Sequence, residues 1–231
     1  NGNYTIAVYN AEDGTYHASN DTAKFTISKA DSTVSAHDVV EVYGTNAVVA
    51  ITSQNATSVN ITVYDKNNNV VFANPAAVSN GNVVLPMLAV GEYGVRLKTN
   101  VDDEHISVTN TSKVTITEAG SIVSAGPVTE VYGINPTLTI SSANATSVNV
   151  VVIDSSSKVV YSNATAAANG NLVLPILATG TYTVSLTTNV DANHSSVSNA
   201  TTVTVTKAPT SVTITPIING TYSVSDVVIV Y

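Results

Sequence analysis

The chain has 231 residues, no cysteine, only eight Lys and Arg, and a formal net charge of −8. Without cysteine no disulfide forms, and without a basic cluster we expect no binding to nucleic acid, whose affinity rests on neutralising phosphates. No apolar run approaches the roughly 18 residues of a membrane span, so we expect no membrane insertion in this segment.

The first predicted element follows Gly2-Asn3-Tyr4, where Ile6 and Val8 recur at every second position. Alternation with period two indicates a strand with one buried face. The same arrangement returns after Gly91-Glu92-Tyr93 and after Gly180-Thr181-Tyr182. A glycine two residues before a tyrosine at the head of a strand resembles the tyrosine corner of immunoglobulin-like sandwiches, in which the phenol bonds upstream backbone. The resemblance implies structural roles for Tyr4, Tyr93, Tyr182, Gly91 and Gly180.

A repeat with a constant spacing of 89 residues organises the whole chain. Glu41-Val-Tyr43-Gly44 recurs as Glu130-Val-Tyr132-Gly133, and Asn55-Ala-Thr-Ser-Val-Asn60 recurs as Asn144-Ala-Thr-Ser-Val-Asn149. Because the chain opens inside a repeat, we expect it to be a segment of a longer protein. The spacing predicts four parts: the last strands of a truncated immunoglobulin-like repeat at 1–29, whole repeats at 30–118 and 119–207, and the first strands of a further repeat at 208–231.

Alternating apolar residues predict seven strands within the repeat 30–118. They lie at 33–36, around Val49 and Ile51, around Val59, Ile61 and Val63, at 70–73, around Val83 and Leu85, after Gly91, and around Val114 and Ile116. The pair Asn80-Gly81 permits the positive φ of a tight turn, and Pro86 ends the strand before it because proline cannot donate to a ladder.

Short alternating strands with turn signals about every ten residues are typical of two-sheet antiparallel sandwiches. We therefore predict an all-β protein of tandem immunoglobulin-like antiparallel β-sandwiches. Only the short segments 117–121 and 206–210 connect the repeats. With such short connections the sandwiches, each about 30 Å long from the rise of its strands, should form an extended, semi-rigid rod.

The chain resembles the bacterial immunoglobulin-like (Big) repeats, particularly those with an L-x-x-G-x-Y strand. The motif reads Leu88-Ala-Val-Gly91-Glu-Tyr93 and Leu177-Ala-Thr-Gly180-Thr-Tyr182. The closing strands read Phe25-Thr-Ile-Ser-Lys29-Ala30, Val114-Thr-Ile-Thr-Glu118-Ala119 and Val203-Thr-Val-Thr-Lys207-Ala208. The resemblance implies an extracellular, cell-surface segment of an adhesin-like protein. Its partners would be neighbouring repeats, together with a host or microbial surface reached through a distal domain.

Sequons for N-glycosylation are frequent, and a chain rich in Asn and Thr also produces them by chance. We expect surface glycosylation at some of them, since Asn60 is predicted to face outward and Asn55 and Asn144 to lie at turns. The ten candidates are Asn3, Asn20, Asn55, Asn60, Asn110, Asn144, Asn163, Asn193, Asn199 and Asn219.

The loop Asp102-Asp103-Glu104 offers oxygen ligands of the kind that calcium takes. The equivalent loop of the next repeat keeps only Asp191 and Asn193, and a single aspartate is more often the residue that forms an Asx turn. We therefore favour turns over a metal site and predict no cofactor.

His105 and His194 occupy the position at which the first copy has Tyr16. A catalytic imidazole would not be exchanged for a phenol, so we expect these rings to pack over the end of a sandwich. Tyr43 and Tyr132, each two residues after a glutamate, could form a ligand patch repeated along the rod. The further repeat keeps the tyrosine as Tyr222 without the acid, which favours a structural plug.

The sequence contains no arrangement of nucleophile, base and orienting group, and no nucleotide or metalloprotease motif. We therefore predict no enzyme but a structural stalk or spacer of an adhesin-like surface protein or fibre. Two alternatives stay open: a fibre subunit that assembles by strand pairing between subunits, and a carbohydrate-binding module, which would need an exposed aromatic platform.

Overall fold

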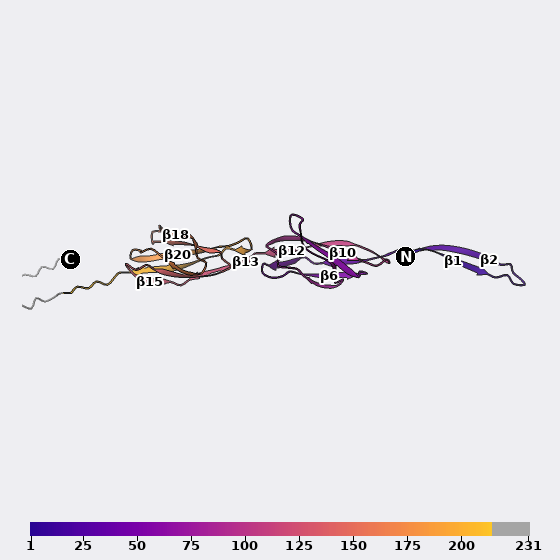
Figure 1. Ribbon diagram of the computed structural model, residues 1–231, viewed down its shortest axis with the longest axis horizontal. Helices are drawn as coiled ribbons and strands as arrows, with labels where there is room; N and C mark the ends of the chain where they lie inside the picture. Colours follow the sequence, from indigo (N-terminus) through magenta and orange to yellow (C-terminus); the bar gives the residue numbers. More distant parts are fainter. Residues whose placement is uncertain (214–231) are drawn as a thin grey trace, which may run out of the picture.

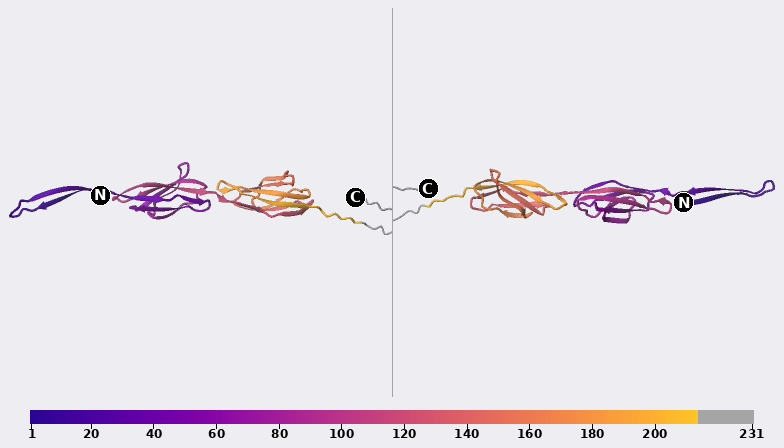
Figure 2. Two further views of the ribbon diagram at one scale, coloured as in Figure 1. Left: turned by 180° about the vertical axis from the view of Figure 1, so that it is seen from behind. Right: turned by 90° about the horizontal axis from the view of Figure 1, so that it is seen from above.

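The computed structural model describes residues 1–213 and consists of a β-hairpin followed by two β-sandwiches, arranged along one line (Figure 1). Views from behind and from above show the same extended order (Figure 2). Within these residues the secondary structure is entirely strands and turns. Most of the predicted part 208–231, including Asn219 and Tyr222, lies outside the described residues.

Each sandwich contains one five-stranded and one three-stranded sheet. In the first, the sheets have the orders β5-β12-β10-β7-β8 and β4-β6-β9, and the short strands β3 and β11 pair separately. The bounds are β3 Ala30–Asp31, β4 Thr33–Ala36, β5 Val39–Val42, β6 Val48–Gln54, β7 Ser58–Tyr64, β8 Val70–Ala77, β9 Gly81–Val84, β10 Gly91–Asn100, β11 His105–Ile106 and β12 Thr109–Thr117.

The second sandwich repeats this topology, with sheets β15-β22-β20-β17-β18 and β14-β16-β19 and the pair β13–β21. Its strands are β13 Ala119–Gly120, β14 Ile122–Ala125, β15 Val128–Val131, β16 Thr137–Ala143, β17 Ser147–Ile153, β18 Val159–Ala166, β19 Gly170–Val173, β20 Gly180–Asn189, β21 His194–Ser195 and β22 Ser198–Thr206. The prediction of tandem antiparallel sandwiches is thereby confirmed.

Each sandwich closes a hydrophobic core of its own. The inward positions of the strands alternate with exposed ones, as the period of two requires. In the first core the fully buried side chains include Val49, Ile61, Leu97 and Val114, and in the second the equivalent residues are Leu138, Val150, Leu186 and Val203.

Several details of the strands differ from the prediction. Strand β9 ends at Val84, one residue before the predicted Leu85, and the two-residue strands β3 and β11 were not predicted. Strand β5, which pairs in parallel with β12 from Val39 to Val42, was not among the predicted strands, because its apolar residues do not alternate. Strand β8 continues to Ala77 and not only to Ala73. It includes Pro75, which is tolerated because β8 lies at the edge of its sheet.

The hairpin comprises β1 (Gly2–Asn10) and β2 (Ser19–Ile27), paired in the register that β10 and β12 also have. The strands that would cover its apolar face are absent from the described residues. Ile6 and Val8 are 53% and 64% exposed, whereas their equivalents Val95 and Leu97 are buried. Tyr4 stacks on Phe25 with ring centroids 5.3 Å apart, and both rings are also largely exposed.

Candidate functional site

The tyrosine corners fix the loop that precedes β10 and β20. The hydroxyl of Tyr93 donates to the carbonyl of Ala89 over 2.9 Å, and that of Tyr182 donates to the carbonyl of Ala178 over 2.8 Å. Both rings are buried, and burial raises the pKa of Tyr93. The loop between Leu88 and Gly91 is therefore held firmly at the end of the first sandwich that faces the second.

The loop Asp191–His194 of the second sandwich contacts the end of the first sandwich at which the loop 88–91 lies. Asp191 Oδ1 accepts hydrogen bonds from the backbone N–H of Asn193 and from Nδ1 of His194, at 2.8 and 2.7 Å. The carbonyl oxygen of Asn193 also accepts from the N–H of Ala119, at the start of the second sandwich. These bonds fix both the loop and the direction of its two final side chains.

Two side chains of this loop contact the first sandwich. Asn193 Oδ1 accepts the backbone N–H of Val90 over 3.0 Å. The imidazole of His194 meets the ring of Tyr43 edge to face, with centroids 5.4 Å apart, a favourable aromatic geometry. The side chain of His194 is only 16% exposed. We call the set Tyr43, Val90, Asn193, His194 and the connecting residues 118–121 the joint.

The connection between the sandwiches is itself hydrogen-bonded. Ala119 and Gly120 form β13, which pairs in parallel with β21 of the second sandwich. Ser121 adds a hydrogen bond from its hydroxyl to the carbonyl of Ser195. The linker therefore belongs to the second sandwich and is not a free tether.

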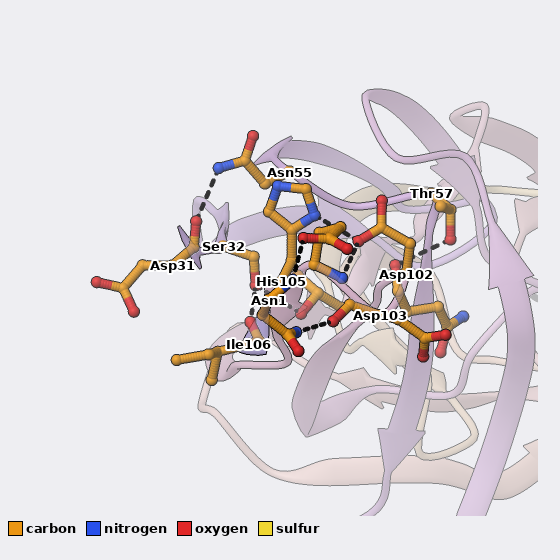
Figure 3. A network of polar contacts seen from close by, with 12 residues as sticks. Asn1, Asp31, Ser32, Asn55, Thr57, Asp102, Asp103, His105 and Ile106 are labelled. Atoms are coloured by element: carbon orange, nitrogen blue, oxygen red, sulfur yellow. Dashed lines mark hydrogen bonds and ion pairs between the residues drawn. The ribbon is translucent and has the colours of Figure 1, made fainter. Parts of the chain in front are cut away.

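The same contact recurs where the hairpin meets the first sandwich (Figure 3). Asn1 stands 89 residues before Val90, and its N-terminal ammonium group forms an ion pair, at 2.9 Å, with Oε2 of Glu104, the side chain equivalent to Asn193; at Val90 the corresponding group is a neutral backbone N–H. Asp102 Oδ1 accepts from His105 Nδ1 and from the N–H of Glu104, and these bonds lower the pKa of Asp102. The linker strand β3 pairs in parallel with β11 as β13 does with β21.

The three acidic residues considered as calcium ligands, Asp102, Asp103 and Glu104, make hydrogen bonds or ion pairs within the protein. Asp102 holds the turn, Glu104 contacts Asn1, and the backbone carbonyl of Asp103 accepts from Asn1 Nδ2. Among residues 1–213 no group of three or more His, Cys, Asp or Glu side chains gathers to hold a metal. The geometry of this loop is that of an Asx turn.

The structure places the sequon asparagines in two groups. Four of them donate the side-chain nitrogen, the atom that a glycan would occupy, to backbone carbonyls: Asn55, Asn110, Asn144 and Asn199. Asn55 and Asn144 also adopt left-handed φ values of 56° and 57°. Asn3, Asn20, Asn60 and Asn163 lie on strands, and no hydrogen bond found among residues 1–213 uses their side-chain nitrogen. Asn193 also keeps its nitrogen out of these bonds but lies at the contact between the sandwiches. Glycosylation stays a prediction, best placed at the four strand positions.

The remaining predicted residues also have defined places. Tyr132, the counterpart of Tyr43, lies at the far end of the second sandwich and is 53% exposed. Tyr4 belongs to the hairpin, and Asn3 Oδ1 accepts the hydroxyl of Thr26 across it. Sequence reasoning missed Val90 and Asn1 as contact points. Two features of the sequence could have indicated them. Both residues stand one position before a Gly-x-Tyr, and a polar residue precedes both His105 and His194.

Comparisons with known proteins give similarity of fold. No protein-family model matches the chain, and no curated protein matches it. Solved structures with a similar fold include titin domains Z1Z2 in complex with telethonin, at 12% identity and TM-score 0.46, covering 80% of this chain and all of that one. Others are the Sidekick-1 immunoglobulin domains 1–5 (13%, 0.33, covering 90% and 46%) and the Clostridium thermocellum CbhA fibronectin(III)-like modules (14%, 0.30, covering 76% and 95%).

Acid should loosen the joint. Hydrogen bonds from the N–H of Asn193 and from His194 lower the pKa of Asp191 below its ordinary value. Because the pKa of Asp191 is lower in the folded than in the unfolded state, its carboxylate stabilises the fold fully above its unfolded pKa, at about pH 4. This stabilisation is lost as the pH falls through the pKa that Asp191 has in the folded state. We expect NMR cross-peaks between the His194 and Tyr43 rings at pH 5 to fade toward pH 3.

The variant Asp191→Asn is the control for this titration, because its amide does not ionise. Its ring contacts, weaker at the outset, should not change further over the same range. Ring contacts of the parent protein that persist unchanged to pH 2.5 would contradict the prediction.

Proposed function

We propose that this chain is a non-catalytic spacer, a stalk segment of an extracellular adhesin-like surface protein of the Big-repeat type. The observation that carries the proposal is the recurrence of one contact at successive junctions. The backbone N–H of Val90 donates to the Asn193 side chain, and at the equivalent position the terminal ammonium of Asn1 contacts the Glu104 side chain. Covalently linked domains move relative to one another by default unless their interface holds them, so a contact at the same repeat positions of both junctions supports a role that needs stiffness.

Other features support the same role. Two ladder bridges tie the linker residues to the following sandwich, so little free chain remains at the joint. Within residues 1–213, no helix is long and apolar enough to cross a membrane. The L-x-x-G-x-Y residues that resemble Big repeats are those of the tyrosine corner, which positions the receiving loop.

The stiffness of the joint can be measured by electron–electron spin distances. The chain has no cysteine, so Ala50→Cys and Thr139→Cys, two exposed and equivalent positions, would carry the only labels. We expect a narrow distance distribution between them. Inserting Gly-Gly-Ser between Glu118 and Ala119, or combining Asn193→Ala with Tyr43→Ala, should broaden it about twofold or more, because a Gly/Ser linker samples many separations.

The matched control is Asn20→Ala, which removes an exposed asparagine of the hairpin, away from the joint and from both labels, and should leave the distribution unchanged. A parent distribution as broad as that of the insertion variant would overturn the spacer proposal.

Assembly between subunits is the second candidate, and one observation favours it. The apolar face of the hairpin, which carries Tyr4, Ile6, Val8 and Phe25, is exposed where the equivalent face in each sandwich is covered. A partner chain that supplied strands corresponding to β4 and β6 would bury this face, since those strands belong to the sheet that packs against β10 and β12.

A further inference from the structure

A groove crosses the outer face of the five-stranded sheet in the first sandwich. Its volume is about 470 Å³, within the range of small-molecule sites, and it is open to solvent. Gly94, in the middle of β10, forms its floor, and a Cβ added there would meet no atom within 4 Å. A glycine inside a strand often marks a place where a ligand approaches the backbone. The side chains around it are those of Asp38, Tyr64, Arg96, Thr111 and Lys113.

The groove continues along the sheet into a second hollow of about 290 Å³. Tyr64 and Arg96 line both, and Lys98 lies at the far end. Arg96 is the only arginine of the chain. Together with Lys98 and Lys113 it places three of the eight Lys and Arg residues on this one face. The ion pairs found among residues 1–213 do not involve these three side chains.

The second sandwich shows that the fold does not require these residues. It has the same sheets and an equivalent core, yet 89 residues further on six of the eight residues that line the groove are replaced by a different kind of side chain, while Val95 is kept as Val184 and Ser112 becomes Thr201. Asp38, Tyr64, Gly94, Arg96, Thr111 and Lys113 correspond to Pro127, Ile153, Thr183, Ser185, Ala200 and Thr202. Threonine replaces the glycine, and the second sandwich has neither a cationic side chain nor a tyrosine at these positions.

We propose that this groove binds an acidic saccharide, one that carries a carboxylate on a sugar ring. The guanidinium of Arg96 presents paired donors that match a carboxylate. The ring of Tyr64, beside the open space over Gly94, offers a flat apolar surface with a polar tip to the face of a sugar. Asp38 uses Oδ1 to accept the N–H of Lys113, which leaves Oδ2 to accept from a sugar hydroxyl.

Charge favours a short acidic saccharide over a long polyanion. The two hollows are lined by Arg96, Lys98 and Lys113 against Asp38, and an adjoining hollow adds Lys66 against Asp65 and Glu92, which leaves a small local excess of positive charge. The whole chain has a net charge of −8, which would repel an extended polyanion. The inference goes beyond the spacer role, since a rigid stalk needs no such groove.

The test is a titration of the complete isotope-labelled chain with trigalacturonate, followed by NMR. We expect shifts confined to β7, β10 and β12, while the equivalent strands β17, β20 and β22 stay unchanged. A neutral trisaccharide should bind at least about tenfold more weakly, because it lacks the partner of the guanidinium. Shifts absent up to about 10 mM, or equal in both sandwiches, would overturn the proposal.

In a second test, single groove residues of the first sandwich are replaced by the residue at the equivalent position of the second sandwich, which should keep the fold and alter the groove. Arg96→Ser and Gly94→Thr should each weaken trigalacturonate binding about tenfold or more, with an otherwise unchanged NMR spectrum. Lys158→Asn is the charge-matched control, because Asn69 stands at that position in the first sandwich, and it should bind as the parent does. If acetate at equal ionic strength produced the same shifts with the same affinity, the site would be a simple anion site and the saccharide proposal would be wrong.

Discussion

Replacing Leu97 by alanine should destabilise the first sandwich by about 2–5 kcal/mol, whereas Val8→Ala in the hairpin should change the stability of the hairpin by less than about 0.5 kcal/mol. The two residues occupy equivalent positions on strands paired in the same register. Leu97 is fully buried, and its truncation leaves a cavity in a closed core; Val8 is 64% exposed and loses little on truncation. Leu97→Ala removes one carbon atom more than Val8→Ala, which accounts for about 0.8 kcal/mol, so the rest of the difference reports the effect of the covering sheet.

Hydrogen exchange measures this effect for each sandwich separately. In Leu97→Ala, amides of β7 and β10 that exchange by unfolding should do so about 30-fold to several thousand-fold faster, and those of β17 and β20 should not change. The matched variant Leu186→Ala should reverse the pattern. If Val8→Ala instead proved as costly as Leu97→Ala, the apolar face of the hairpin would be covered in solution, which would favour assembly between subunits.

The sequence predicted those features that depend on local periodicity. The strands of Val59, Ile61 and Val63 and of Val114 and Ile116 have their buried faces as expected, because each alternates cleanly with polar residues. Strand β5 was missed because Val39, Val40 and Val42 do not alternate and because its partner, β12, lies far away in the chain. A parallel edge strand has too little local pattern to be recognised.

The sites were harder to foresee because they join residues from different elements. Asn193 was singled out as a glycosylation candidate and as part of the loop weighed as a calcium site, and nothing in its neighbourhood indicates that its oxygen reaches Val90, 103 residues earlier. The groove has no motif at all, since its residues stand at outward positions of three strands. A position-by-position comparison of the two whole repeats would have found it, because Gly94 and Arg96 face Thr183 and Ser185 in that alignment.

Gly180→Ala should destabilise the second sandwich by about 1–3 kcal/mol, through strain and not through lost contacts. Gly180 has φ of +154°, a conformation that residues with a Cβ rarely adopt, and its added Cβ would lie 4.0 Å from the ring of Tyr182. Relief of the strain would move the loop whose Ala178 carbonyl accepts the Tyr182 hydroxyl. Amides of β17 and β20 should then exchange about five- to 150-fold faster.

The control for this strain is Gly94→Ala, a glycine inside a strand without a positive φ and with open space around its Cβ. That substitution should be neutral or stabilise the first sandwich by up to about 1 kcal/mol, because alanine loses less conformational freedom on folding. A cost for Gly94→Ala equal to that of Gly180→Ala would refute the assignment to backbone strain. In Gly91→Ala the same strain would act beside Val90, so a loss of stability there should be accompanied by a loosened joint, which links the tyrosine corner directly to the stiffness of the rod.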